Sequence, residues 1–248
     1  MGLFQNAWKV YLGNLSISLW FALLLVFTAW FPVFFNMIYS SGTIFWEYGF
    51  SASTASLLAE VISVILYVLL YSFFLCMIVF GVRKELSAVR IQYYFKEVLS
   101  KIALKMFAFF LLYTLLLLLV SFGLFGSQAP LWLIALVLLI LSAPVIFMPQ
   151  IIVIEELPVF EALAESIDFT RRNWKFTGTV LVLGSLMLVA LMLIEYAVDL
   201  AYPTLFAGRM VSLLLALLFV IPFMESLKTY FYMMKYGIIR SIEELYTR

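Results

Sequence analysis

Residues 102–125 read IALKMFAFFLLYTLLLLLVSFGLF, and Lys105 is the only charged side chain in this run. A hydrocarbon core about 30 Å thick requires about 20 mainly apolar residues in helical form, so the stretch is long enough to cross a membrane. It does not alternate between polar and apolar residues, which argues against a strand of a membrane barrel. Backbone polar groups in lipid must be satisfied within the segment, and the stretch is therefore predicted to be a transmembrane helix.

Five further stretches have the same character, and together they predict six membrane spans. The composition agrees, because 66% of the chain is hydrophobic and 12% is charged, whereas soluble domains carry about 25% charged residues. The predicted fold class is an all-α integral membrane protein, a single polytopic domain over residues 1–248 with amphipathic helices between the spans. The predicted spans are 15–38, 57–80, 102–125, 130–154, 176–197 and 205–224.

The basic residues are distributed unevenly between the connections. Of the 15 Lys and Arg residues, 14 lie at the amino end, in the second and fourth connections or in the tail, and Arg209 alone lies on the other side. By the positive-inside rule both termini are predicted to be cytoplasmic. The 14 residues are Lys9, Arg83, Lys84, Arg90, Lys96, Lys101, Lys105, Arg171, Arg172, Lys175, Lys228, Lys235, Arg240 and Arg248.

Residues that usually carry chemistry are scarce in this chain. There is no histidine, which removes the commonest general base and the commonest metal ligand. No glycine-rich phosphate loop and no HExxH or GxSxG pattern occurs, and the single cysteine, Cys76, is expected to be a packed apolar residue. We therefore expect no enzymatic activity, no metal and no cofactor. Nucleic acid is not expected as a partner either, because the chain has no basic domain in water.

Two connections between predicted spans have helical periodicity of their own. Residues 83–102 are expected to form an amphipathic helix. Residues 158–174 are expected to form a second one, with proline in its first turn and Glu161 and Glu165 facing water. Its apolar stripe, predicted to face lipid headgroups or the bundle, is Phe160, Leu163, Ile167, Thr170 and Trp174.

The amino end, residues 3–12, is also amphipathic, so a helix followed by a two-span hairpin would occur three times. Two interpretations of this pattern stay open. The three units are either a true internal repeat or three unrelated amphipathic helices that precede membrane spans.

A resemblance to a known family rests on four short segments, APV at 143–145, IIVIEE at 151–156, FEALAES at 160–166 and RRNW at 171–174. They resemble the recurring segment of a broad family of bacterial and archaeal six-span proteins, which includes the membrane domain joined to some glycerophosphodiester phosphodiesterases. Pro222 and Tyr230 in and after the last span extend the likeness. The resemblance implies six spans in a prokaryotic plasma membrane. It implies no activity, because the soluble phosphodiesterase domain with its metal-binding residues is absent.

Glu225 is the first candidate for a functional residue. It follows Pro222 in the last span, and Lys228 lies three residues further along the same helical face. A charge within the bilayer is usually turned inward and paired, and Pro222 would free a backbone carbonyl one turn earlier. The alternative is that the span ends here, with both charges at the wet interface.

Two further sets of residues are candidate binding sites. Gln150 follows Pro149 in a fourth span that also contains Pro144, so this span is expected to be bent or partly unwound, beside a cavity. At the other side of the membrane, Glu195 and Asp199 form an acidic pair close to Arg209. We expect an ion pair that joins the ends of the fifth and sixth spans, and the alternative is a cation site.

The leading functional hypothesis from the sequence is a non-enzymatic membrane scaffold that contacts membrane lipids or a partner. A homo-oligomer and a membrane protein partner both stay open. The alternative is a small transporter or channel that uses the bent fourth and sixth spans. A polar cavity reaching Glu225 or Gln150 would favour transport, and a dry core would favour the scaffold.

Overall fold

The computed structural model describes residues 3–24, 37–40, 43–46, 54–87, 95–202 and 207–237. Within these ranges, five helices are long and apolar enough to cross a membrane, and a bent pair at the amino end makes a sixth if it is counted as one span. The predicted fold class is confirmed: the chain is an all-α multi-pass membrane protein. Of the predicted basic residues, Arg90, Arg240 and Arg248 lie outside the described ranges.

The amino end forms two short helices, α1 (Leu3–Gly13) and α2 (Leu15–Leu19), and the chain bends by 68° between them. Asn14 lies at the bend. Its side-chain Nδ2 donates to the carbonyl of Val10 at 2.9 Å, as a short amide can when it competes with the backbone for hydrogen bonds.

The predicted first span, 15–38, is wrong at its end, where the structure has a short β-hairpin. Met37 and Ile38 belong to strand β1 (Met37–Ser40), which pairs antiparallel with β2 (Thr43–Trp46). The two runs are rich in β-branched and aromatic residues on either side of a Ser-Gly pair, which is a hairpin signal. The apolar content of this stretch concealed that signal.

The second and third spans are the long helices α4 (Thr54–Leu86) and α5 (Phe95–Gly126). The separate amphipathic helix predicted over 83–102 is wrong for the described part of this stretch, and residues 88–94 lie outside the described residues. Its first residues continue α4 and its last residues begin α5, because RKEL at 83–86 are good helix formers with no break signal before them. Arg83 and Lys84 occupy the last turn of α4, where cations favour the helix dipole.

The fourth span is interrupted, as its two prolines predicted. Helix α6 (Leu131–Ser142) leads into a 3-10 turn, η1 (Ala143–Val145), and the span resumes as α7 (Met148–Ile154). Pro144 lies in the 3-10 turn and Pro149 in the first turn of α7, where the missing N–H is least costly.

The predicted helix over 158–174 is present as α8 (Val159–Arg172). Its face toward the rest of the protein consists of Ala162, Ser166 and Phe169, all buried, whereas Phe160 and Ile167 are 78% and 48% exposed. The predicted stripe is therefore not the face that packs on the rest of the protein, because Phe160 and Ile167 point outward.

The last two spans are α9 (Trp174–Ala201) and one long helix that consists of α10 (Ala207–Leu215), a π-helical turn and α11 (Ile221–Lys235). A π-helical turn, η2 (Ala216–Val220), joins α10 to α11 just before Pro222. Prolines and π-turns are the usual causes of a helix kink, and both occur here.

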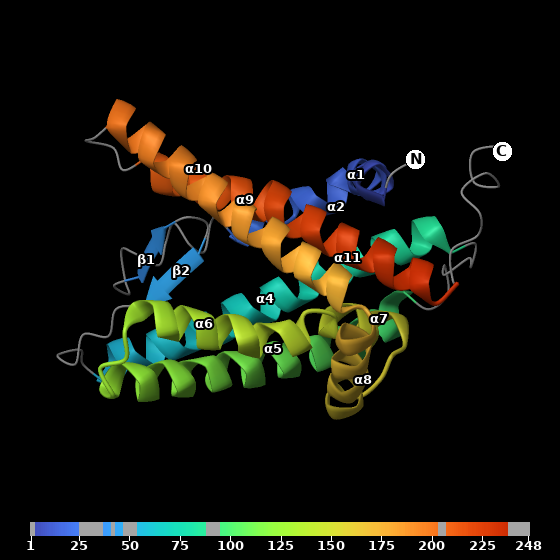
Figure 1. Cartoon of the computed structure of the whole chain (residues 1–248), viewed down its shortest axis with the longest axis horizontal. Helices are drawn as coiled ribbons and strands as arrows, with labels where there is room; N and C mark the ends of the chain where they lie inside the picture. The colour runs from blue at the N-terminus through green and yellow to red at the C-terminus, as the bar shows by residue number, and fades with distance from the viewer. Residues whose placement is uncertain are drawn as a thin grey trace.

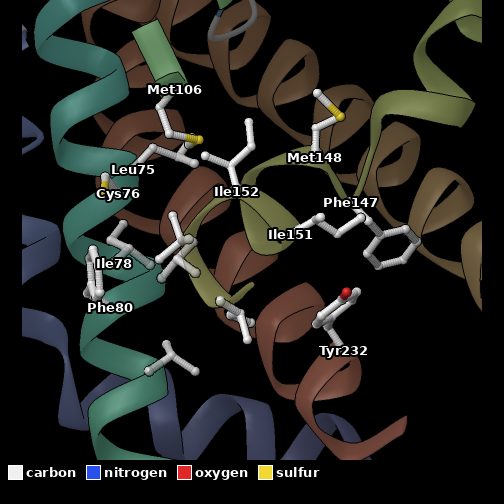
Figure 2. Packing of buried hydrophobic residues seen from close by; sticks show 14 of the residues in the cluster. Leu75, Cys76, Ile78, Phe80, Met106, Phe147, Met148, Ile151, Ile152 and Tyr232 are labelled. Atoms are coloured by element: carbon white, nitrogen blue, oxygen red, sulfur yellow. The ribbon is translucent and has the colours of Figure 1, made fainter. Parts of the chain in front are cut away.

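Figure 1 shows α4, α5 and α6 side by side, with α9, α10 and α11 forming a second group, and α7 and α8 at the junction. Helix α11 packs on α4 and α1, and α7 packs on α4. The largest apolar cluster lies between α4 and α7 and extends to α11 (Figure 2). Cys76 is buried in this cluster as a free thiol, as predicted.

Candidate functional site

A polar cluster lies where the interrupted fourth span meets the last span. Lys228 Nζ is 2.5 Å from Glu225 Oε1, and Gln150 Nε2 donates to Glu225 Oε2 at 2.7 Å. Lys228 Nζ also donates to the carbonyl oxygen of Ile146 at 3.1 Å. We call Gln150, Glu225, Lys228 and the Ile146 carbonyl the polar cluster. The structure thus places Glu225 inside the protein, and not at the wet interface.

The positions of these side chains follow from the local sequence. Glu225 and Lys228 are three residues apart in α11, so they lie on one helical face. Gln150 directly follows Pro149, and the break before α7 turns its side chain toward α11. The break also leaves the Ile146 carbonyl without a partner in a regular helix, and Lys228 takes that place.

The polar cluster is almost completely enclosed. Gln150 has no exposed surface, and Glu225 and Lys228 are each 7% exposed. Burying two charges is costly unless they are paired and hydrogen-bonded, and here both carboxylate oxygens and the ammonium have partners. One acceptor of the polar cluster has no partner, because Gln150 Oε1 is buried without a hydrogen bond.

Helix α8 closes the rest of the break in the fourth span. Ser166 Oγ donates to the carbonyl of Pro144 at 2.6 Å, and Thr170 Oγ1 lies 3.5 Å from the carbonyl oxygen of Ala143. Unwound backbone at membrane depth is tolerated only where protein or water satisfies it. Here side chains of α8 and α11 satisfy it from both sides.

In the last span, Pro222 leaves one backbone carbonyl without its usual helical partner. Pro222 has no N–H to bond the carbonyl four residues earlier, which is that of Leu218. The hydroxyl of Tyr11 in α1 donates to this carbonyl at 3.0 Å. The freed carbonyl that the sequence predicted is therefore occupied by a side chain of the first helix.

Basic residues of the neighbouring spans cap the end of α7. Arg83 Nη1 donates to the carbonyl of Val153 at 3.0 Å, and Lys105 Nζ donates to the carbonyl of Glu156 at 2.6 Å. Glu156 has a φ of 60°, in the left-handed region, where the chain leaves the helix. Cations at a helix C-terminus stabilise its exposed carbonyls, so these contacts fix the end of α7.

Two tyrosines, one in the last turn of α11 and one directly after it, connect this helix to acidic residues around α8. Tyr232 OH donates to Glu155, and Tyr236 OH donates to Glu165 at 2.6 Å. Burial, and then the hydrogen bond to Glu165, raises the pKa of Tyr236 to about 12. The hydroxyl therefore keeps its proton at physiological pH and remains a donor.

The second predicted set of residues lies at the far end of α9. Gly208 N donates to Asp199 Oδ1 at 2.9 Å, and Ser212 Oγ donates to Glu195 Oε2 at 2.9 Å. A Cβ at Gly208 would lie 2.3 Å from the carbonyl oxygen of Glu195, so α9 and α10 approach closely here. These contacts join the two helix ends, and the ion pair with Arg209 stays a prediction.

Sequence reasoning missed two buried amides of α1 and the bend. Asn14 Nδ2 donates to Glu85 Oε2 at 2.7 Å, and Asn6 Nδ2 donates to Tyr230 OH at 3.1 Å. A Cβ at Gly81 would lie 2.5 Å from Asn14 Oδ1, so a larger residue there would have to displace the Asn14 side chain. Two asparagines at a spacing of eight residues, Asn6 and Asn14, were the available signal.

An apolar groove of about 440 Å³ runs along the outside of α9. Val182 and Leu186 in its wall are each 61% exposed, so the groove opens to the outside of the protein. We call it the α1–α9 groove, and its lining is Phe4, Gly178, Thr179, Val182, Leu183 and Leu186.

The polar cluster and the α1–α9 groove are two chemically different features of the described residues. The first is an enclosed set of charges, whereas the second is an open surface lined almost entirely by hydrocarbon. Neither resembles an arrangement of nucleophile and base. Comparison of the chain with protein-family models, with curated proteins and with solved structures finds no match.

Proposed function

We propose that this chain is a non-enzymatic scaffold of a prokaryotic plasma membrane that binds membrane lipids or a membrane protein partner. The observation that carries the proposal is the state of the polar cluster. Both carboxylate oxygens of Glu225 and the ammonium of Lys228 are bound by groups of the protein. These contacts hold the fourth and last spans together through groups of the protein itself.

The outer surface supports the same proposal. Large apolar side chains of α9 are exposed along its length, among them Leu193 and Leu200 at 63% and 72%. In a bilayer these side chains meet acyl chains or another apolar helix. The sequence also resembles a family of six-span proteins that includes the membrane domain joined to some glycerophosphodiester phosphodiesterases, which agrees with a role in the membrane.

The orientation of the chain across the membrane is part of the proposal. With 14 of 15 basic residues on one side, both termini and α8 are expected in the cytoplasm. Labelling of a cysteine at position 168 in intact cells tests this. The orientation is wrong if an impermeant reagent reacts at position 168 as readily as at position 199.

A second candidate function is transport. The observation that favours it is the meeting of the interrupted fourth span with the last span at a buried ion pair, because discontinuous helices near the membrane midplane often form transport sites. An ionisable residue within the membrane is also a functional candidate by default, and Gln150 Oε1 is a buried acceptor without a partner.

Flux measurements separate the two functions. The full chain is reconstituted into liposomes, and uptake of protons, Na⁺, K⁺ and Cl⁻ is followed against protein-free liposomes. The scaffold predicts no flux above the protein-free level for any of these ions. Flux of any of these ions through the wild-type chain above the protein-free level would contradict the scaffold and establish transport.

A further inference from the structure

The α1–α9 groove follows the depth of one membrane leaflet. Helix α9 begins at Trp174, and the groove residues on it run from Gly178 to Leu186. At 1.5 Å per residue, Leu186 lies about 16 Å deeper along the helix than Lys175. This is about half of a hydrocarbon core about 30 Å thick, so the groove has the reach of a single acyl chain.

The shallow end of the groove carries positive charge. Lys175 lies three and four residues before Gly178 and Thr179, so it shares their face of α9. Its Nζ is 5.8 Å from the centre of the Trp174 ring, and tryptophan is enriched at the membrane interface. Lys175 is exposed, as is the neighbouring Arg171. A cation at this depth attracts the phosphate of an anionic lipid.

The lining of the groove offers almost no polar group to a ligand. Thr179 is its only polar side chain, and Thr179 Oγ1 donates within its own helix to the carbonyl of Lys175 at 2.9 Å. Val182 and Leu186 add two branched walls, and Phe4 of α1 closes the other side. Hydrocarbon is therefore the material that fits the groove, and an anion fits its end.

We propose that the α1–α9 groove binds one acyl chain of an anionic phospholipid whose phosphate lies against Lys175. The inference rests on the proposed function and deepens it, because it names the lipid class and the place where it binds. It differs from general coating by lipid in that one site should depend on the residues that open the groove.

Gly178 provides the test of the site. A Cβ at Gly178 would meet no heavy atom within 4 Å, so Gly178→Leu fills the groove without disturbing the helix packing. Gly123 of α5 is the matched control, because a Cβ there also meets nothing within 4 Å. Leucine is a better helix former than glycine, and both variants are expected to fold, which their melting temperatures check.

Binding is measured by native mass spectrometry of the full chain with added dioleoylphosphatidylglycerol or dioleoylphosphatidylcholine. Gly178→Leu should weaken the affinity for the first bound phosphatidylglycerol molecule by about tenfold, or about 1.4 kcal/mol. Gly123→Leu should leave this affinity unchanged. Lys175→Gln should reduce the preference for phosphatidylglycerol over phosphatidylcholine. Equal affinities for Gly178→Leu and Gly123→Leu would overturn the site.

A second measurement identifies the occupant independently of any variant. Phosphatidylglycerol with a photoactivatable acyl chain is incorporated into vesicles with the wild-type chain, and the cross-linked peptides are sequenced. The proposal expects labelling to concentrate on 178–186. A second copy of the chain bound at these residues instead of lipid would overturn it.

The failure of the site can be distinguished from the failure of the proposed function. If phosphatidylglycerol binds preferentially but Gly178→Leu has no effect, the groove is wrong and the scaffold stands. If the liposomes show flux that depends on Glu225, the proposed function is wrong whatever the groove binds.

Discussion

Removing either charge of the polar cluster should destabilise the protein far more than removing both. Glu225→Gln leaves Lys228 buried beside a neutral side chain, and Lys228→Met leaves the carboxylate with Gln150 alone. Breaking a buried ion pair typically costs about 3–5 kcal/mol, whereas replacing both members is often close to neutral. The measurement is the thermal stability of both single variants and the double variant in one detergent.

The chain offers a matched control for this cycle. Asp168 and Arg172 of α8 also form an ion pair, at 2.6 Å, but their side chains are 42% and 75% exposed. An exposed pair contributes at most about 1 kcal/mol, so Asp168→Asn, Arg172→Met and their double variant should have small effects. Effects at Glu225 and Lys228 that are equally small and additive would place that pair in water and refute the cluster.

The second large effect is expected at Phe169 on the inner face of α8. Its ring lies 4.7 Å from the rings of both Phe147 and Tyr232, measured between ring centres, and its side chain is 3% exposed. Phe169→Ala should cost about 3–5 kcal/mol through lost burial and the cavity left behind. It should also loosen the break in the fourth span, because α8 holds that break through Ser166.

Phe160→Ala is the control, because Phe160 lies on the same helix and is 78% exposed. Its stability cost in detergent should be within about 0.5 kcal/mol, as for other surface substitutions. Both variants are compared by thermal unfolding monitored through circular dichroism. If the two substitutions cost the same, α8 does not dock through Phe169, and the assigned orientation is wrong.

Much of the fold could be predicted because membrane helices carry a strong local signal. Long apolar runs such as 102–125 have one physical solution in lipid, and the prolines at 144, 149 and 222 mark breaks through their missing N–H groups. The hairpin at β1 and β2 was hidden because its residues are as apolar as a span. The helix predicted over 83–102 failed because periodicity does not show where one helix ends and the next begins.

The polar cluster could be predicted only in part. The i, i+3 spacing of Glu225 and Lys228 indicates a shared face, but whether that face is inside or at the interface depends on packing across the chain. The contact with Gln150 joins residues 75 positions apart, and no local pattern encodes it. The hydrogen bond from Tyr11 to Leu218 is similar, because the freed carbonyl was predictable and its donor was not.

The interior around Glu225 should be closed to water, and the reactivity of a single cysteine shows whether it is. Thr229 has no exposed surface and lies one turn from Glu225, so Thr229→Cys places a small thiol beside the polar cluster. Cys76→Ala removes the native thiol, and Glu165→Cys provides a partly exposed control. In permeabilised membranes, a small water-soluble thiol reagent should label the cysteine at residue 165 and leave the cysteine at residue 229 unmodified. Labelling of the two cysteines at comparable rates would contradict a closed interior, because it would require a water-filled path to the polar cluster.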